Sequence, residues 1–229
     1  MKVLAVGAHS DDIEIFMYGL LSIYKKEGHE VYTIIATDGA KGGAVTGKKL
    51  ARERVNEATK GLEKLSSPIF LNLPDGELGI EMEHAMIIKE SILKIMPDLV
   101  ITHSENDYHA DHKSLSLITK GAVSHYIPIL YCDTLMGINF HPNYYVDITD
   151  YYIAKKNAIL KHKSQNPQRF VDLFELMNSY RAAQCNAPIG CYAEAYSFIP
   201  SFPFSDIREI LPSALKLRPF HIENHHGFL

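Results

Sequence analysis

Histidine and aspartate occur together in two short segments of the chain, one near the amino terminus and one near the middle. Their titratable members are His9, Asp11, Asp12, His103, Asp107, His109, Asp111 and His112. His9 and Asp12 have the i, i+3 spacing that places two side chains on the same face of a helix turn. A catalytic zinc site needs three protein ligands, typically imidazoles and carboxylates, and one open position. His9 and Asp12 with one histidine of the second segment would form such a set.

This combination of residues favours hydrolytic chemistry. A bound zinc ion lowers the pKa of water and polarises a carbonyl group. A carboxylate that does not bind the metal could accept a proton from the water, and a spare imidazole could donate one to a leaving amine. For the first segment alone, a simpler interpretation is that Asp11 or Asp12 caps a helix and interacts with its dipole. Two such segments at equivalent strand ends favour the metal site.

Alternating strand and helix patterns position both segments. The sequence predicts strands over 3–7, 31–36, 68–73 and 98–102 and helices over 13–27, 48–65, 81–96 and 113–125. This alternation is typical of βαβ units, and right-handed crossovers give a Rossmann-like α/β three-layer fold with a mostly parallel sheet. Each His/Asp segment directly follows a strand. Because ligands bind at the carboxyl ends of the strands in such folds, we expect both segments at one edge of the sheet.

The rest of the chain is less regular. It predicts strands over 128–132, 144–148 and 193–198 and helices over 150–163 and 171–183. No linker or internal repeat is visible, so we interpret residues 1–229 as a single domain, and the structure of the tail from about residue 212 stays open.

Composition limits the classes of function. The chain is 46% hydrophobic and 22% charged, which is typical of a folded globular protein. A net charge of -4 without a dense Lys/Arg run argues against nucleic-acid binding. No segment reaches the roughly 20 apolar residues of a membrane span, and the first apolar run is too short for a signal peptide. Three cysteines at irregular spacing fit a reducing compartment, so we expect a cytoplasmic protein.

These segments resemble motifs of the LmbE-like, or PIG-L, family of N-acetylglucosamine deacetylases. VGAHSDDIEI, residues 6–15, is similar to the Ala-His-Pro-Asp-Asp motif of that family, and HADH, residues 109–112, to its His-x-Asp-His motif. Other similar segments follow in order: TDGAKGG at 37–43, RVNEA at 54–58, LNLPDGEL at 71–78, AILKHKSQ at 158–165 and YAEAYSF at 192–198. The likeness therefore covers most of residues 1–200.

The resemblance implies a metal set and a general base. His9, Asp12 and His112 match the zinc ligands of the family, with one Zn²⁺ per chain. Asp11 matches the base that activates the attacking water, and this division of roles between Asp11 and Asp12 comes from the family alone. Iron or cobalt would also suit a set of two histidines and an aspartate, because affinity discriminates poorly among these metals.

Three further residues take their roles from the resemblance. His109 matches the imidazole that stabilises the oxyanion and protonates the leaving amine, and Asp111 matches the carboxylate that orients this imidazole. Arg54 lies where the family often contacts sugar hydroxyls. There are two departures from the pattern. Ser10 replaces the usual proline, and Tyr108 stands one residue later than a tyrosine found in some relatives, so the assistance of a phenol to the oxyanion stays open.

The resemblance implies a zinc-dependent N-deacetylase that hydrolyses the acetamide of a GlcNAc-containing sugar conjugate to free amine and acetate. It does not name the aglycone, and the family includes both monomers and homo-oligomers. Two other hypotheses stay open. The same site could hydrolyse a non-sugar amide or acyl substrate, or the chain could be a non-enzymatic nucleotide-binding α/β module. The density of His and Asp argues against the last, because phosphate sites favour glycine-rich amides and helix N-termini.

Three other titratable residues have two interpretations each. Glu14 is either a partner of a metal ligand or an acid on a helix surface. His103 either supports the metal site or is simply packed. His162, in the later similar segment, either approaches the site or has no part in it.

Overall fold

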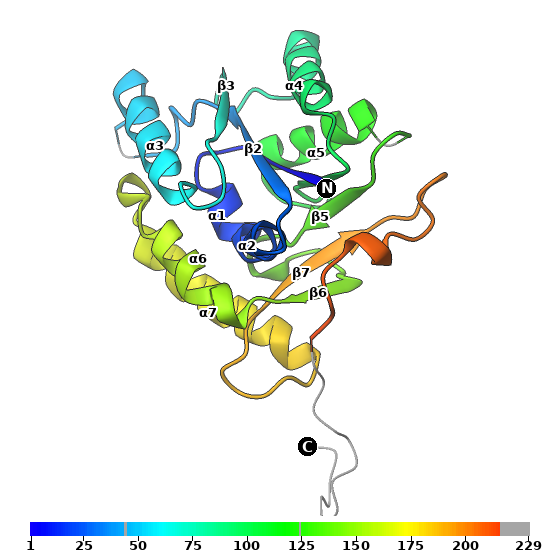
Figure 1. The fold of residues 1–229 in the computed structure, drawn as a ribbon. Coiled ribbons are helices and arrows are strands. Elements are labelled where there is room, and N and C mark those ends of the chain that lie inside the picture. Colours follow the sequence, from blue (N-terminus) through cyan, green and yellow to red (C-terminus); the bar gives the residue numbers. More distant parts are fainter. Residues whose placement is uncertain (44, 124, 216–229) are drawn as a thin grey trace, which may run out of the picture.

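Seven strands form one mixed sheet in the computed structural model, which describes residues 1–43, 45–123 and 125–215 (Figure 1). The strand order is β3-β2-β1-β4-β5-β7-β6. The five parallel strands are β1 (Lys2–Gly7), β2 (Glu30–Thr37), β3 (Ile69–Leu73), β4 (Leu99–Thr102) and β5 (Ile129–Cys132). The other two strands are β6 (Tyr144–Asp147) and β7 (Ala193–Phe198). Strand β7 lies between β5 and β6 and is antiparallel to both. The predicted Rossmann-like, mostly parallel α/β fold is confirmed.

Helices cover both faces of this sheet (Figure 1). One face carries α4 (Met82–Ile95) and α5 (Ala110–Val123). The other carries α1 (Asp12–Phe16), α2 (Tyr18–Lys26), α3 (Lys48–Gly61), α6 (Tyr152–Ile159) and α7 (Pro167–Gln184). In β1, Val3 and Ala5 pack on the second group, whereas Leu4 and Val6 pack on the first, because successive strand residues point to opposite faces. A strand covered on both faces needs a continuous apolar run, which is what the sequence shows.

The helix predicted over residues 13–27 is interrupted in the structure. It is divided into α1 and α2 at Met17, whose φ of −131 lies outside the helical range. The break exposes backbone amides at the start of α2, and the carboxylate of Glu194 accepts hydrogen bonds from Gly19 N at 2.9 Å and Leu20 N at 2.8 Å. Glu194 belongs to β7, so this contact cannot be inferred from the local pattern around Met17.

Glu194 is also the acceptor of a buried network. Lys155 Nζ lies 2.8 Å from Glu194 Oε1, and the Tyr196 hydroxyl donates to Oε2 at 2.8 Å. Lys155 and Glu194 are 0% and 2% exposed. Burying a charge is costly unless it is paired and hydrogen-bonded, and here the pair joins α2, α6 and β7. The network fixes the helices of one sheet face to the antiparallel end of the sheet.

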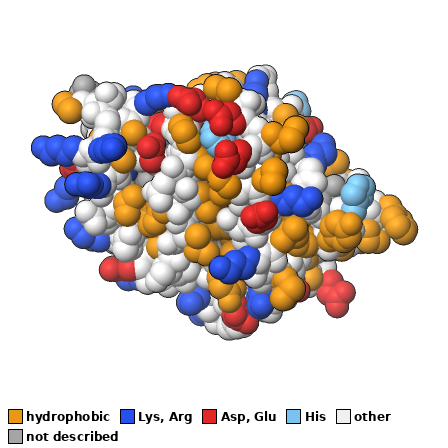
Figure 2. Space-filling model, turned by 90° about the horizontal axis from the view of Figure 1, so that it is seen from above, with side chains coloured by type: hydrophobic (Ala, Val, Ile, Leu, Met, Phe, Trp, Pro, Cys, Tyr) orange, Lys and Arg blue, Asp and Glu red, His pale blue; other side chains and the backbone are white. Residues whose placement is uncertain are grey.

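The surface carries charge unevenly. Seen from above the view of Figure 1, Lys and Arg side chains gather at the end of the molecule where α3 lies (Figure 2). Hydrophobic side chains gather at the opposite end, over the segment after β7, where Ile199 and Phe202 are exposed. The paired lysines at 48–49 lie on the exposed side of α3, as expected for a solvated helix face.

The tail has little regular structure where it is described. The short helical turn Arg208–Ile210 is followed by residues 211–215 without helix or strand, and residues 216–229 lie outside the described residues. The single-domain interpretation of 1–229 stays a prediction. In the described ranges, no helix is both long and apolar enough to cross a membrane.

Replacing Glu194 by Ala is expected to lower the free energy of unfolding by roughly 3–5 kcal/mol, because Lys155 would keep a buried charge without its partner. Chemical denaturation followed by circular dichroism measures this. The control is Glu175→Ala, which removes a half-exposed carboxylate 3.8 Å from Lys156 Nζ and should change stability by less than about 0.5 kcal/mol. Equal effects of the two changes would contradict the role given to Glu194.

Candidate active site

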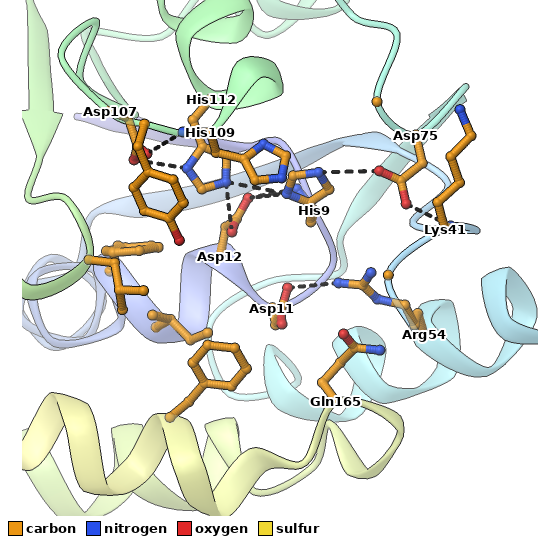
Figure 3. A pocket seen from close by; sticks show the side chains of 17 residues that line it. His9, Asp11, Asp12, Lys41, Arg54, Asp75, Asp107, His109, His112 and Gln165 are labelled. Atoms are coloured by element: carbon orange, nitrogen blue, oxygen red, sulfur yellow. Dashed lines mark hydrogen bonds and ion pairs between the residues drawn. The ribbon is translucent and has the colours of Figure 1, made fainter. Parts of the chain in front are cut away.

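The loops after β1, β2, β3 and β4 surround a cavity of about 380 Å³ (Figure 3). The residues that these loops and the first turns of the helices after them contribute to its lining are His9, Asp11, Asp12, Lys41, Gly42, Asp75, Gly76, Asp107, Tyr108, His109 and His112. The chain leaves β1 toward β2 on one side, and β4 lies on the other. Such a reversal of strand order opens a crevice at the carboxyl ends of the strands, which is where α/β proteins bind ligands. The two His/Asp segments therefore meet where the sequence places them.

The side chains of His9, Asp12 and His112 contact one another. His9 Nδ1 is 3.3 Å from His112 Nε2 and 3.4 Å from Asp12 Oδ2, and His112 Nε2 is 3.3 Å from Asp12 Oδ1. Ligands placed tetrahedrally about 2 Å from a zinc ion are roughly 3.3 Å apart. These three residues thus have the chemistry and the spacing to hold a metal ion. Other groups with ligand atoms within 4.8 Å of one another are His9/His109/His112, Asp12/His103/His112 and His9/Asp75/Asp111.

Carboxylates contact the outer nitrogen of both imidazoles. His112 Nδ1 is 2.9 Å from Asp107 Oδ2. His9 Nε2 is 3.2 Å from Asp111 Oδ2 and 3.4 Å from Asp75 Oδ1. A carboxylate on the far nitrogen fixes the orientation of a metal-binding histidine and raises its basicity. Sequence reasoning did not assign this task to Asp107 or Asp75, although both stand in loops that directly follow a strand.

The carboxylates also control the protonation of the two imidazoles. Burial lowers the pKa of His9, but the charge of Asp12 and hydrogen bonds to the surrounding carboxylates raise it well above its usual value. Burial likewise opposes the charge of Asp12 and the bond to Asp107, which together raise the pKa of His112 to about 9. A cation that binds these nitrogens must displace their protons, so its affinity should depend on pH.

The resemblance implies that the Asp111 carboxylate orients His109. In the structure this carboxylate does not contact His109. The Asp111 carboxylate accepts hydrogen bonds from Gly76 N at 2.7 Å and Leu78 N at 3.2 Å and lies 3.2 Å from His9 Nε2. The reason is the position of α5, which begins at Ala110 rather than near residue 113 and holds Asp111 in its first turn beside the loop after β3. Asp111 therefore orients His9.

His109 is held by a backbone amide. The Asp111 N–H donates to His109 Nδ1 at 3.3 Å, so the neutral imidazole carries its proton on Nε2. An imidazolium would place a second N–H against the same amide. Burial lowers the pKa of His109, and the neighbouring His9 and His112 lower it further. Near neutral pH, His109 is therefore a neutral donor with one N–H.

Asp11 forms a buried ion pair with Arg54. Arg54 Nη2 donates to Asp11 Oδ1 at 2.8 Å, and Nη1 donates to the carbonyl of Gly39 at 3.2 Å. In the described part of the chain, Asp11 Oδ2 has no hydrogen-bond partner, and Asp11 lines the cavity. A Cβ atom at Gly42 would overlap Arg54 Nη1, so the glycine at this position makes room for the guanidinium.

The structure decides between the two interpretations given for each of Glu14, His103 and His162. His103 Nε2 is 3.1 Å from Asp12 Oδ2, and the His103 ring stacks on His112 with centroids 3.7 Å apart. Through these two contacts, His103 supports Asp12 and His112. Glu14 Oε1 and His162 Nε2 are 2.8 Å apart and fully buried, and this pair ties α1 to the segment after α6 without lining the cavity.

A family model and a named relative match this chain. A family model described as PIG-L, GlcNAc-PI de-N-acetylase, matches residues 4–123. The diacetylchitobiose deacetylase of Thermococcus kodakarensis is 29% identical over 222 residues, which cover 87% of this chain and 83% of that protein.

Two solved structures show the same fold at low identity. The N,N'-diacetylchitobiose deacetylase of Pyrococcus horikoshii is similar with a TM-score of 0.76 and 24% identity, covering 87% of this chain and 84% of that one. A 4-carboxy-2-hydroxymuconate hydratase from Pseudomonas putida has a TM-score of 0.77 and 19% identity, covering 90% and 99%. Since a hydratase and a deacetylase both share the fold, the reaction must be argued from the site.

Replacing Gly42 by Ala is expected to separate Arg54 from Asp11, because the new Cβ would overlap the guanidinium. The resulting strain should cost about 1–3 kcal/mol of unfolding free energy. A crystal structure of the variant and its denaturation curve test both effects. The control is Gly121→Ala in α5, where a Cβ meets nothing within 4 Å and alanine favours the helix. An intact Arg54–Asp11 pair in the Gly42 variant would show that the loop yields instead.

Proposed function

Since this chain belongs to the PIG-L family, as the match over residues 4–123 establishes, we propose that it is a zinc-dependent N-deacetylase of a GlcNAc-containing sugar conjugate. Its products would be the free amine and acetate. One observation carries the proposal: His9, Asp12 and His112 form a compact ligand set, and the carboxylate of Asp11 next to it keeps one oxygen free. A metal beside an available base is an arrangement that can hydrolyse an amide.

His9, Asp12 and His112 would hold the zinc ion. When bound there, zinc supplies a Lewis acid that polarises the acetamide carbonyl and makes water more acidic. Asp107, on His112, and Asp111, on His9, keep the two imidazoles in their orientation.

Asp11 would act as the general base. Its Oδ1 is fixed by Arg54, so Oδ2 is the atom that accepts the proton of the attacking water. As the carbon–nitrogen bond breaks, the same carboxylic acid would pass this proton to the leaving nitrogen, because Asp11 lines the cavity beside the reacting amide.

His109 would stabilise the oxyanion as a neutral donor. The amide of Asp111 occupies its Nδ1, so Nε2–H is the group that is available to hydrogen-bond a developing negative charge. The family resemblance also gives His109 the task of protonating the amine. The lowered pKa of His109 and the N–H facing its Nδ1 disfavour an imidazolium, and we therefore give the amine proton to Asp11.

The polar end of the cavity would hold the sugar. Lys41, Arg54, Asp75 and Gln165 line it and supply both donors and acceptors for hydroxyl groups. The relative from Thermococcus is named for diacetylchitobiose, an N-acetylated amino sugar, which supports a substrate of this class. The aglycone stays open. A non-sugar amide would use the same metal site and base, so a substrate panel must separate the two.

The test measures metal content and acetate release together on wild type, His112→Ala and Asp11→Asn, with free GlcNAc, GlcNAc conjugates and simple acetamides as substrates. Wild type should hold about one divalent metal per chain and release acetate from a sugar. His112→Ala should lose both properties. Asp11→Asn should keep the metal and lose about 10²–10⁴-fold in kcat/KM.

Each outcome of this panel has a distinct meaning. Wild-type activity of Asp11→Asn would refute the assignment of the base. Metal without acetate release from any sugar would move the chain to another class of amide or acyl substrate. A wild-type protein that binds neither zinc nor another divalent metal would contradict the proposal as a whole and favour the nucleotide-binding module.

Replacing Asp107 by Asn is expected to weaken zinc binding by roughly 10–100-fold, because His112 would lose the charged acceptor at Nδ1. Competition with a chromogenic chelator measures the affinity without any assay of activity. Asp206→Asn, at an exposed aspartate paired with Arg208 in the segment after β7, serves as control and should leave the affinity unchanged. An unchanged affinity in Asp107→Asn would show that the carboxylate does not support the metal ligand.

A further inference from the structure

The cavity has two ends of different chemistry. The polar end is lined by Lys41, Arg54, Asp75 and Gln165. Apolar and aromatic residues line the rest, namely Ile15, Phe16, Tyr108, Leu135 and Phe170. Figure 3 shows aromatic and aliphatic lining side chains, without labels, on the side of the cavity away from Lys41, Asp75 and Arg54. The His/Asp cluster stands between the two ends.

Hydrogen bonding assigns the sugar to one end. Its hydroxyl groups need partners, and a buried hydroxyl without one costs free energy. The polar end offers such partners in the side chains of Lys41, Arg54, Asp75 and Gln165. Among the apolar lining residues, only the Tyr108 side chain carries a polar atom, and it is 59% exposed. The sugar therefore belongs with Arg54.

The position of the sugar determines that of the acyl group. The carbonyl carbon of the scissile amide has the sugar nitrogen on one side and the acyl chain on the other. With the carbonyl at the His/Asp cluster and the sugar at the polar end, the acyl chain points to the apolar end. We propose that this end is an acyl pocket and that the protein removes acyl groups longer than acetyl from amino sugars. The proposal rests on the N-deacetylase function proposed above.

The pocket is built and supported by its surroundings. Ile15 and Phe16 belong to α1, and the ring of Phe16 packs edge-on against Phe174 with centroids 5.2 Å apart. Leu135 follows Asp133, whose carboxylate forms a buried double hydrogen bond with Arg181 of α7 at 2.7 and 3.0 Å.

The apolar end of the cavity offers more apolar surface than one methyl group can cover. Leu135 and Phe170 are only half-buried and come from different elements, the turn Leu135–Gly137 and the first turns of α7. Together with Ile15 and Phe16, they present apolar surface that a chain of several carbons would remove from water, which is favourable.

The reaction is a balanced hydrolysis. Water adds its oxygen to the carbonyl carbon, the carbon–nitrogen bond breaks, and the products are a carboxylic acid and the amino sugar. One proton of the water passes through Asp11 to the amine nitrogen. No oxidant, reductant or second substrate is required.

The experiment measures kcat/KM for N-acetyl, N-propionyl, N-butyryl and N-hexanoyl glucosamine, by detecting the free amine that all four release. Each added methylene should raise kcat/KM by up to about fourfold until the pocket is filled. A tenfold or larger loss from acetyl to propionyl would overturn the acyl pocket while leaving the deacetylase function intact. No amine release from any of the four, or from GlcNAc conjugates, would instead reject the function itself.

Two variants test the location of the pocket. Leu135→Trp should fill it and lower the ratio of kcat/KM for butyryl to acetyl by at least tenfold, whereas Phe170→Ala should enlarge it and favour hexanoyl. Leu176→Trp makes the same change at a 65% exposed leucine of α7 outside the cavity lining, and should leave the ratio unchanged.

A parallel series places the alkyl chain on the other side of the sugar. Suppose that kcat/KM rises with chain length for alkyl glycosides of GlcNAc but not for the N-acyl series, and that Leu135→Trp abolishes this rise. The apolar end then holds the aglycone and the proposal is wrong. If both Leu135→Trp and Phe170→Ala leave the acyl-length profile of the wild type unchanged, the acyl chain does not occupy this end.

Discussion

The carboxylate of Asp12 lies among three buried imidazoles, and the site depends on this contact. Its oxygens are 3.4 Å from His9 Nδ1, 3.1 Å from His103 Nε2 and 3.3 Å from His112 Nε2. Burial raises the pKa of Asp12, but the charges of these imidazoles lower it well below its usual value. A buried charge persists only when it is paired. The pairing here requires β1 and β4 to be parallel neighbours, because His9 and Asp12 follow one strand and the other two histidines follow the second.

Most of the fold follows from the sequence because local signals suffice for it. Buried parallel strands read as short apolar runs, and β1 to β5 appear close to where these runs lie. The meeting of the two His/Asp segments follows from the rule on strand ends alone. The break at Met17 does not, because the carboxylate of Glu194, which accepts the backbone amides at the start of α2, belongs to the distant strand β7. The insertion of β7 between β5 and β6 is likewise a long-range choice that no local pattern encodes.

Within the site, residue types were easier to predict than partners. The sequence predicts that Asp111 belongs to the site. Which imidazole its carboxylate faces depends on the start of α5, which lies three residues earlier than predicted. With α5 beginning at Ala110, the carboxylate faces His9 and the backbone amide faces His109. The likeness to a hydratase of the same fold shows why such details matter: the fold supplies the crevice, and the orientation of individual donors and acceptors selects the chemistry.

The different surroundings of Asp11 and Asp12 give a physical basis for different roles. Both oxygens of Asp12 face imidazoles, and Oδ2 also accepts the His9 amide at 2.7 Å, so this carboxylate is committed to the ligand cluster. Asp11 faces a guanidinium that holds only Oδ1. Arg54 can reach it because Gly39 and Gly42 leave the necessary space. Two adjacent acids of identical chemistry thus become a candidate ligand and a candidate base through their partners, and the glycines of a loop far along the chain are part of that distinction.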